Sequence, residues 1–158
     1  MDNVFWLLQG KLAGRPGPAK VPWDLAELRR TFDVMLNISE HPSATEELDR
    51  LRFEHRWIPL PETVPADEEA EERCLRLLPE AEQYLCEQLD SGRRVLVHCV
   101  SGKDRTGMLF AYHLARLDGM DAVAALDRVR RVRPQALSAG GWEAMALRVM
   151  RRLEASEE

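Results

Sequence analysis

The 158-residue sequence is poor in cysteine, with three residues at positions 74, 86 and 99. An odd number of cysteines without the dense spacing of a small secreted domain argues against structural disulfides and favours a reducing compartment. The sequence also has no apolar run long enough to span a membrane, and no basic N-terminal region followed by an apolar block. We therefore expect a cytoplasmic protein without a targeting segment. Cys74 and Cys86 are interpreted as core residues, the less favoured alternative being redox partners of Cys99.

The chain also lacks the excess of positive charge that is typical of nucleic-acid-binding proteins. It has 22 Lys and Arg against 27 Asp and Glu, a net charge of −5, so we expect no nucleic-acid partner. Arginines gather in 128–133 and 148–152. We interpret them as solvated helix faces, or alternatively as a positive rim that steers an anionic substrate. Repeats and low-complexity tracts are absent, and the length fits one domain that spans 1–158.

The most informative segment is the run His98-Cys99-Val100-Ser101-Gly102-Lys103-Asp104-Arg105-Thr106-Gly107. The preceding Val95-Leu96-Val97 is typical of a buried strand, and 108–117 of an amphipathic helix. A loop curled at a helix N-terminus offers backbone N–H groups to a dianionic phosphate, and its positive field stabilises a thiolate at its first position. An arginine at its end can take two phosphate oxygens. The sequence thus predicts metal-free covalent phosphoryl transfer, with Cys99 as nucleophile and Arg105 as phosphate ligand.

The remaining residues of this run are expected to support that chemistry. Thr106 places a hydroxyl beside the thiolate, and the glycines at 102 and 107 allow tight curvature and close approach to a ligand. His98 either orders the loop or is an ordinary core histidine. A zinc site built from His98, Cys99 and His113 is disfavoured by the ligand spacing, so no metal or cofactor is expected. The substrate-binding candidates are Val100, Ser101, Gly102, Lys103, Asp104 and Arg105, with His98 and Gly107 as loop-supporting residues.

The run resembles the His-Cys-x5-Arg-Thr/Ser-Gly active-site loop of the cysteine-based protein tyrosine phosphatases, and the chain is most similar to the small atypical dual-specificity phosphatases. Residues 3–14 are similar to the N-terminal strand pair of that family, and 129–134 to the end of its penultimate helix. The resemblance implies hydrolysis of phosphotyrosine, with phosphoserine and phosphothreonine as further candidates, through a phosphocysteine intermediate. The partners would then be phosphorylated proteins or small phosphate esters. Two alternatives stay open: a phosphoinositide or small phosphate-ester phosphatase, and a non-catalytic phosphate-binding adaptor.

The resemblance also implies a general acid, usually an aspartate, on a loop that follows an earlier strand. Here the segment 58–67 begins with Ile-Pro, and the residue in the acid position is Glu62, in a slightly shorter loop. Asp67 is the alternative acid, its other role being to cap the following helix. The family often has a glutamine that places the hydrolytic water, and Trp142 stands at that position here.

The spacing of apolar residues predicts strands that alternate with helices. This pattern indicates an α/β fold, a central mostly parallel sheet flanked by helices as in the protein tyrosine phosphatases, with the site at the carboxyl end of a strand. Pro79 is expected to kink or divide the long helix, and Ser43–Glu46 to form a capping box. The predicted strands are 4–13 (a pair), 34–39, 52–58 and 95–97; the predicted helices are 23–32, 43–51, 67–89, 108–117, 121–133 and 142–153.

Overall fold

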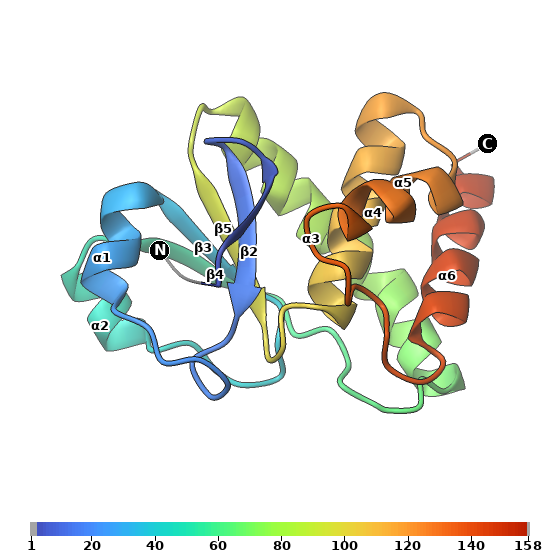
Figure 1. Cartoon of the computed structure of the whole chain (residues 1–158), viewed down its shortest axis with the longest axis horizontal. Helices are drawn as coiled ribbons and strands as arrows, with labels where there is room; N and C mark the ends of the chain where they lie inside the picture. Colours follow the sequence, from blue (N-terminus) through green and yellow to red (C-terminus); the bar gives the residue numbers. More distant parts are fainter. Residues whose placement is uncertain (1–2, 158) are drawn as a thin grey trace.

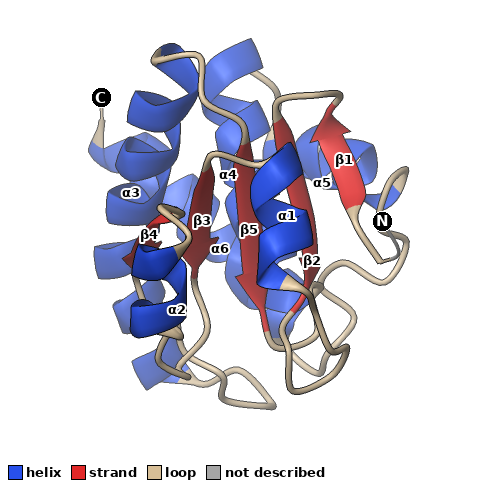
Figure 2. Cartoon of the chain, turned by 90° about the vertical axis from the view of Figure 1, so that its left-hand side faces the viewer, coloured by secondary structure: helices blue, strands red, loops and turns tan. Residues whose placement is uncertain are grey.

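The computed structural model describes residues 3–157 and is built on a five-stranded sheet in the order β1-β2-β5-β3-β4 (Figure 2). β1 pairs with β2 in the antiparallel sense, and every other neighbouring pair is parallel. The predicted mostly parallel sheet is therefore confirmed. The strands are β1 (Phe5–Leu8), β2 (Leu12–Pro16), β3 (Val34–Asn37), β4 (Glu54–Trp57) and β5 (Val95–Cys99).

Helices cover both faces of the sheet (Figure 1). One face carries α1 (Leu25–Thr31) and α2 (Thr45–Arg50). The other carries α3 (Glu68–Asp90), α4 (Asp104–Asp118), α5 (Ala122–Arg130) and α6 (Trp142–Ser156). Successive residues of a strand point to opposite faces, so Leu96 of β5 packs with the first pair of helices and Val97 with the second group. Among the described helices, none has the length and apolarity needed to cross a membrane.

The helix α3 continues through Pro79 as one element, so of the predicted kink or division at this proline the division is wrong. A proline inside a helix removes one backbone hydrogen bond and costs roughly 3 kcal/mol. Leu78 and Ala81 on either side of it are fully buried in the core. Leu85 of the same helix is also fully buried, and at about 2 kcal/mol for each leucine the burial of Leu78 and Leu85 outweighs the defect at Pro79.

The helix α2 also starts differently from the prediction. Its N-cap is Ala44, and no side chain caps its first turn, so the predicted capping box is wrong. The hydroxyl of Ser43 instead accepts a hydrogen bond from the side-chain amide of Asn37, over 3.0 Å. Asn37 is buried at the end of β3, and a buried amide needs a hydrogen-bond partner. Ser43 provides that partner and does not cap α2.

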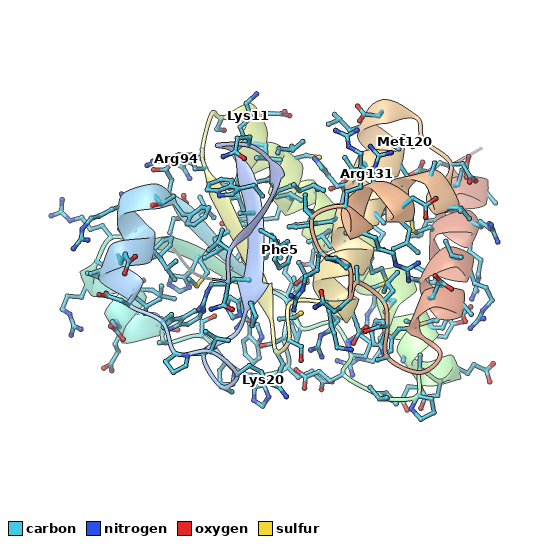
Figure 3. The ribbon with its side chains drawn as sticks, viewed as in Figure 1. Phe5, Lys11, Lys20, Arg94, Met120 and Arg131 are labelled. Atoms are coloured by element: carbon cyan, nitrogen blue, oxygen red, sulfur yellow. The ribbon has the colours of Figure 1, made fainter. Side chains whose placement is uncertain are left out.

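The four parallel strands end at the same edge of the sheet, where the loops after β2, β3, β4 and β5 gather (Figure 2). Lys20, on the loop after β2, lies at this end of the molecule, whereas Lys11 and Arg94 lie at the opposite end (Figure 3). Ligands of open α/β sheets bind at the carboxyl ends of the strands. The topology therefore points to this edge as the place for a functional site.

Candidate active site

Cys99 is the last residue of β5, at the carboxyl edge of the sheet between β2 and β3. Its side chain is almost fully buried. The hydroxyl of Thr106, in the first turn of α4, donates a hydrogen bond to Cys99 Sγ over 3.1 Å. The sulfur is thus placed beside the N-terminus of α4, as the sequence predicts.

The loop between β5 and α4 is shorter than the sequence indicates. The predicted helix starts at residue 108, but α4 begins at Asp104, so that only residues 100–103 are outside regular structure. The amide of Gly107 donates to the carbonyl of Lys103 over 3.0 Å, which brings the end of the 98–107 run into the first helical turn. Arg105 and Thr106 consequently project from the first turn of α4 and not from the loop.

The carbonyl groups of this loop are held from outside. The amide of Gly17, just after β2, donates to Val100 O over 2.9 Å. Arg133, in the segment between α5 and α6, donates from Nη2 to Ser101 O over 2.7 Å and from Nε to Gly102 O over 3.0 Å. Because a trans peptide is planar, each N–H points away from the carbonyl of the preceding residue. The amides of residues 101–103 therefore face the inner side of the loop, where a phosphate would lie.

Glycine is required where β2 presses against this loop. Gly102 has φ +65°, a conformation that other residues rarely adopt, and a Cβ there would lie 2.8 Å from Pro16 N. At Gly17 a Cβ would lie 2.5 Å from Cys99 O. Gly107 has a different role from the predicted curvature: it lies within α4, where a Cβ would come 3.0 Å from Ala136 Cβ.

Arg105 and Glu62 meet at the mouth of the loop. Arg105 Nη1 lies 3.3 Å from Glu62 Oε1, and the arginine is largely buried. Glu62 is fixed by Glu40, on the loop after β3: the amide of each residue donates to a carboxylate oxygen of the other, over 2.7 and 2.6 Å. His41 Nε2 lies 3.8 Å from Glu62 Oε2. The structure thus brings Glu62 beside Arg105, and Glu40 is a contact that sequence reasoning missed.

Asp67, the alternative acid, caps α3. Its side chain accepts a hydrogen bond from the amide of Ala70 over 2.8 Å. It does not line the cleft described next. The contacts of Asp67 therefore match the second role that the sequence suggested for it, the capping of the following helix.

A cleft of about 380 Å³ opens over the loop, and Arg105 and Glu62 line it. Lys103 and Asp104 also line it, but they are engaged with each other, Nζ to Oδ2 at 3.2 Å. Asp104 in addition accepts from the amide of Ala139 over 3.1 Å. Basic and acidic groups nearly balance around this opening. The lining residues are Lys20, Glu62, Val64, Val100, Ser101, Lys103, Asp104, Arg105, Ala139 and Trp142.

Trp142 is the first residue of α6 and is almost fully buried. Its indole N–H donates to Thr63 O over 2.9 Å. Thr63 follows Glu62 directly, so Trp142 anchors the loop that carries the candidate acid. An indole has no acceptor atom with which to hold a water for hydrolysis, and the glutamine function that the family resemblance implied has no counterpart at this position.

His98 is buried, and neither ring nitrogen has a hydrogen-bond partner of good geometry among the described residues. The ring packs edge-on against Trp23, with centroids 4.9 Å apart. Burial lowers its pKa from the ordinary 6.5 to about 4, a shift that the backbone of Cys99 opposes and Arg15 assists. His98 is therefore neutral near pH 7, and its contacts match the core histidine of the two interpretations.

The other two cysteines are poor candidates for redox partners. Burial, the largest effect in both, raises the pKa of the Cys74 thiol to about 12 and that of Cys86 to about 11. A thiol must ionise to exchange with another sulfur, so both react slowly. His113, considered with His98 and Cys99 as a zinc ligand, instead contacts Glu82 and Cys86.

Three of the seven arginines in the two basic segments pair with acidic residues on neighbouring helices. Arg148 and Arg152 bind Glu71 of α3, and Arg130 binds Glu143 of α6. These contacts match the interpretation as solvated helix faces. Arg133 differs from these three, because it donates to two carbonyls of the active-site loop.

The comparisons with known proteins agree with this geometry. The family model described as dual specificity phosphatase, catalytic domain, matches residues 26–146. A crystal structure of Tk-PTP in the active form is 26% identical, covers 98% of this chain and 97% of its own, and has a TM-score of 0.78. Two further structures share the fold at lower identity: human DUSP28 (17%, TM-score 0.73, 98% and 97% covered) and PTPMT1 in complex with PI(5)P (14%, TM-score 0.74, 99% and 100% covered).

Proposed function

Because the chain belongs to the dual specificity phosphatase family and is a cysteine-based phosphatase, we propose that it hydrolyses phosphotyrosine in proteins through a phosphocysteine on Cys99. Phosphoserine and phosphothreonine are the further substrates to test. The observation that carries the proposal is the position of Cys99 Sγ, at the end of β5, 3.1 Å from the hydroxyl of Thr106. The inward-facing amides of 101–103 and the guanidinium of Arg105 complete an anion site around it.

In the first step the Cys99 thiolate attacks phosphorus, and the bond from phosphorus to the ester oxygen breaks. Arg105 and the loop amides hold the equatorial phosphate oxygens, where negative charge is concentrated. The departing oxygen needs a proton, and Glu62 supplies it from the mouth of the cleft. Its contacts with Glu40 place that carboxyl group before the substrate binds.

In the second step a water molecule attacks the phosphocysteine and the bond from sulfur to phosphorus breaks. Glu62, now ionised, accepts the proton of the water, and the product is inorganic phosphate. The sulfur leaves as a thiolate, and the hydrogen bond from Thr106 stabilises it. No step requires a metal ion.

The charge of the cleft favours a phosphoprotein over an inositol phosphate that carries several phosphates. Lys20, Lys103 and Arg105 face Glu62 and Asp104, and Lys103 is already paired with Asp104. A polyphosphorylated headgroup would need several unpaired cations. The structural similarity to PTPMT1 in complex with PI(5)P makes a phosphoinositide the comparison substrate.

The single core on each face of the sheet supports one phosphatase domain over 1–158, and free thiols at all three cysteines support a cytoplasmic location.

The test is turnover of para-nitrophenyl phosphate in the presence of EDTA, followed by a phosphotyrosine peptide, a phosphothreonine peptide and a short-chain PI(5)P. We expect activity that survives EDTA, is blocked by vanadate and disappears in Cys99→Ser, with the highest kcat/KM on the phosphotyrosine peptide. A higher kcat/KM on PI(5)P would replace the protein substrate with a phosphoinositide. Folded wild-type protein that binds vanadate without turnover would identify a phosphate-binding adaptor.

A further inference from the structure

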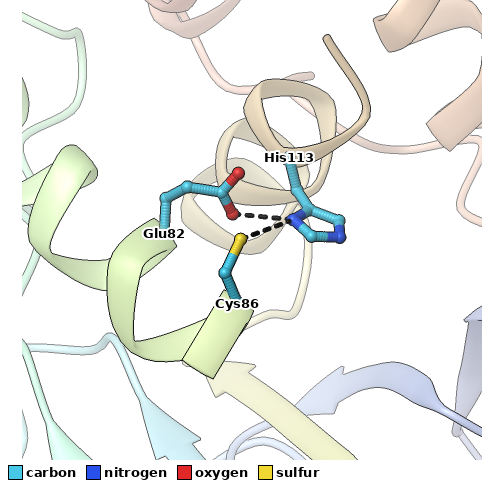
Figure 4. Close-up of side chains that lie close together, drawn as sticks. All are labelled: Glu82, Cys86 and His113. Atoms are coloured by element: carbon cyan, nitrogen blue, oxygen red, sulfur yellow. Dashed lines mark hydrogen bonds and ion pairs between the residues drawn. The ribbon is translucent and has the colours of Figure 1, made fainter. Parts of the chain in front are cut away.

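A second group of reactive side chains lies between α3 and α4, and none of its members takes part in the reaction described above. Glu82 and Cys86 are four residues apart on α3 and so share one helix face. His113 meets them from α4 (Figure 4). His113 Nδ1 lies 2.7 Å from Glu82 Oε1 and 3.9 Å from Cys86 Sγ. One ligand atom from each residue lies within 4.8 Å of the other two.

The hydrogen bonds inside the protein leave this group incomplete. Glu82 and His113 are both more than nine-tenths buried. Glu82 Oε2 has no hydrogen-bond partner among the described residues. A buried carboxylate is costly unless its oxygens are paired, and a single imidazole contact pairs only one of them. A cation held between these side chains would compensate the buried negative charge.

We propose that Glu82, Cys86 and His113 bind a Zn²⁺ ion that joins α3 to α4. Thiolate, imidazole and carboxylate are all zinc ligands, whereas Mg²⁺ and Ca²⁺ select oxygen atoms alone. With tetrahedral bonds of about 2.0–2.3 Å, neighbouring ligand atoms are roughly 3.3–3.6 Å apart. The two measured separations, 2.7 and 3.9 Å, each lie within about 1 Å of that range. On binding, Cys86 releases its thiol proton, and His113 carries its proton on Nε2 so that Nδ1 can coordinate.

The ion has a route to these ligands. Glu82 and Cys86 line a surface groove of about 440 Å³ between α3 and the C-terminal end of the chain. The groove is rich in carboxylates, which attract cations, and its single arginine, Arg116, is paired with Glu157. Three protein ligands leave the fourth position of a tetrahedral zinc ion for water. The groove is lined by Pro79, Glu82, Gln83, Cys86, Glu87, Asp90, Tyr112, Arg116 and Glu157.

Zinc binding at this place would stabilise the two helices that carry or adjoin the active-site segments. α4 bears Arg105 and Thr106 in its first turn, and α3 begins directly after the loop that carries Glu62. An ion bound to the folded protein alone raises its melting temperature by mass action. We expect Zn²⁺ to stabilise the pair of helices while the reaction itself proceeds without metal.

The test uses Co²⁺, which takes the place of Zn²⁺ and gives a visible spectrum. The parent protein is the untagged Cys99→Ser variant, because the nucleophile is itself a possible metal-binding thiol. We expect one Co²⁺ per chain, with visible bands of tetrahedral cobalt and a near-ultraviolet sulfur-to-cobalt charge-transfer band. Zn²⁺ should displace the Co²⁺ and raise the melting temperature of the parent.

Variants of the two remaining cysteines decide the assignment. Cys86→Ser, which keeps the size of the side chain, should abolish the charge-transfer band, and His113→Gln should weaken Co²⁺ binding at least about tenfold. Cys74→Ala, which removes a buried thiol of the same helix outside the group, should leave the spectrum unchanged. A band that persists in Cys86→Ser overturns the proposal. The proposal is also overturned if the parent protein binds no Co²⁺ although it is folded. A melting curve recorded separately in EDTA shows whether the metal-free parent is folded.

Discussion

The guanidinium of Arg105 and the carboxylate of Glu62 lie 3.3 Å apart at the mouth of the active-site loop. The proposed reaction requires both groups for other partners: Arg105 for the phosphate oxygens and Glu62 for the departing ester oxygen. A bound phosphate must therefore take the place of the carboxylate at Arg105. This contact couples the phosphate ligand to the candidate acid, and it makes the role of Glu62 measurable in two ways.

We predict that Glu62→Gln lowers kcat for alkyl phosphates by about 10²–10⁴-fold, the usual contribution of a general acid. The effect on para-nitrophenyl phosphate should be much smaller, because a nitrophenolate leaves without a proton. The same substitution should tighten vanadate binding about two- to fivefold, since an ion pair whose carboxylate is partly exposed contributes roughly 0.5–1 kcal/mol. Steady-state kinetics on the two esters and vanadate inhibition measure both effects.

Asp67→Asn is the matched control, because asparagine also caps helices. It should leave the ratio of alkyl to aryl rates unchanged. If Asp67→Asn shows the dependence on leaving group and Glu62→Gln does not, Asp67 is the acid and the assignment of Glu62 is wrong.

Glu40 is predicted to act as a positioning residue for Glu62. Glu40→Ala removes the oxygen that accepts from the amide of Glu62 over 2.6 Å, so the acid loop loses one of its anchors. Misplacing a catalytic group reduces the rate, and we expect kcat for alkyl phosphates to fall about tenfold. Glu40→Gln retains an acceptor oxygen and should restore most of this activity. Equal losses for Ala and Gln on both esters would argue against positioning.

The parts of the site that the sequence predicts are those that lie close together along the chain. Cys99, Arg105 and Thr106 belong to one strand–loop–helix unit, so their spacing alone brings them together. Glu62 is identified only through the resemblance to the phosphatase family. Its distance from the active-site loop depends on how β4 and α3 are placed in the fold, and spacing along the chain does not show this.

The residues that the sequence does not reveal are those whose role depends on a contact between distant segments. Glu40 and Arg133 read as ordinary surface charges, yet one holds Glu62 and the other holds two loop carbonyls. The group of Glu82, Cys86 and His113 depends on the packing of α3 against α4. Pro79 shows the same limit: its local preference predicts a kink or a division, and the burial of α3 keeps the helix undivided.

Thr106 is predicted to act mainly on the second step. Thr106→Val removes the hydroxyl that donates to Cys99 Sγ, while the side chain keeps its shape in a fully buried site. A thiolate leaving group stabilised by one fewer hydrogen bond should slow hydrolysis of the phosphocysteine by about tenfold or more. Rapid-mixing kinetics should then show a burst of nitrophenol followed by a slow phase. Thr106→Ser retains the hydroxyl and should lack the burst, and an equal burst in both variants would contradict this role.

Arg133 is predicted to maintain the anion site without touching the substrate. Arg133→Ala removes the donors to Ser101 O and Gly102 O, and the loop amides then lose their fixed direction. We expect KM and the vanadate inhibition constant to rise about tenfold, in keeping with roughly 1 kcal/mol for each hydrogen bond lost. Arg131→Ala, at an exposed position two residues earlier, should change neither constant. Identical effects at both positions would indicate long-range charge and not the clamp on the loop.

The buried imidazole of His98 should make the fold sensitive to acid. Its pKa in the folded protein is about 4, below the ordinary 6.5, because burial disfavours the charged ring. Between these two pH values the unfolded chain binds a proton that the folded chain does not, so the free energy of unfolding falls as the pH falls. The stability is complete above about pH 6.5 and declines toward pH 4, by at most about 3 kcal/mol for a single group. Urea denaturation followed by tryptophan fluorescence across this range measures the decline.

The His98→Gln variant separates this effect from the other titrating groups. Glutamine does not titrate, so the variant should lose less stability between about pH 6.5 and pH 4 than the wild type does, whatever its stability at neutral pH. The difference between the two slopes is the contribution of His98, because His41, His55 and His113 are common to both proteins. Parallel slopes would mean that His98 gains a proton in the folded state as easily as in the unfolded chain. The imidazole would then have a hydrogen-bond partner for its charged form. The result would favour the other interpretation of His98, a residue that orders the active-site loop.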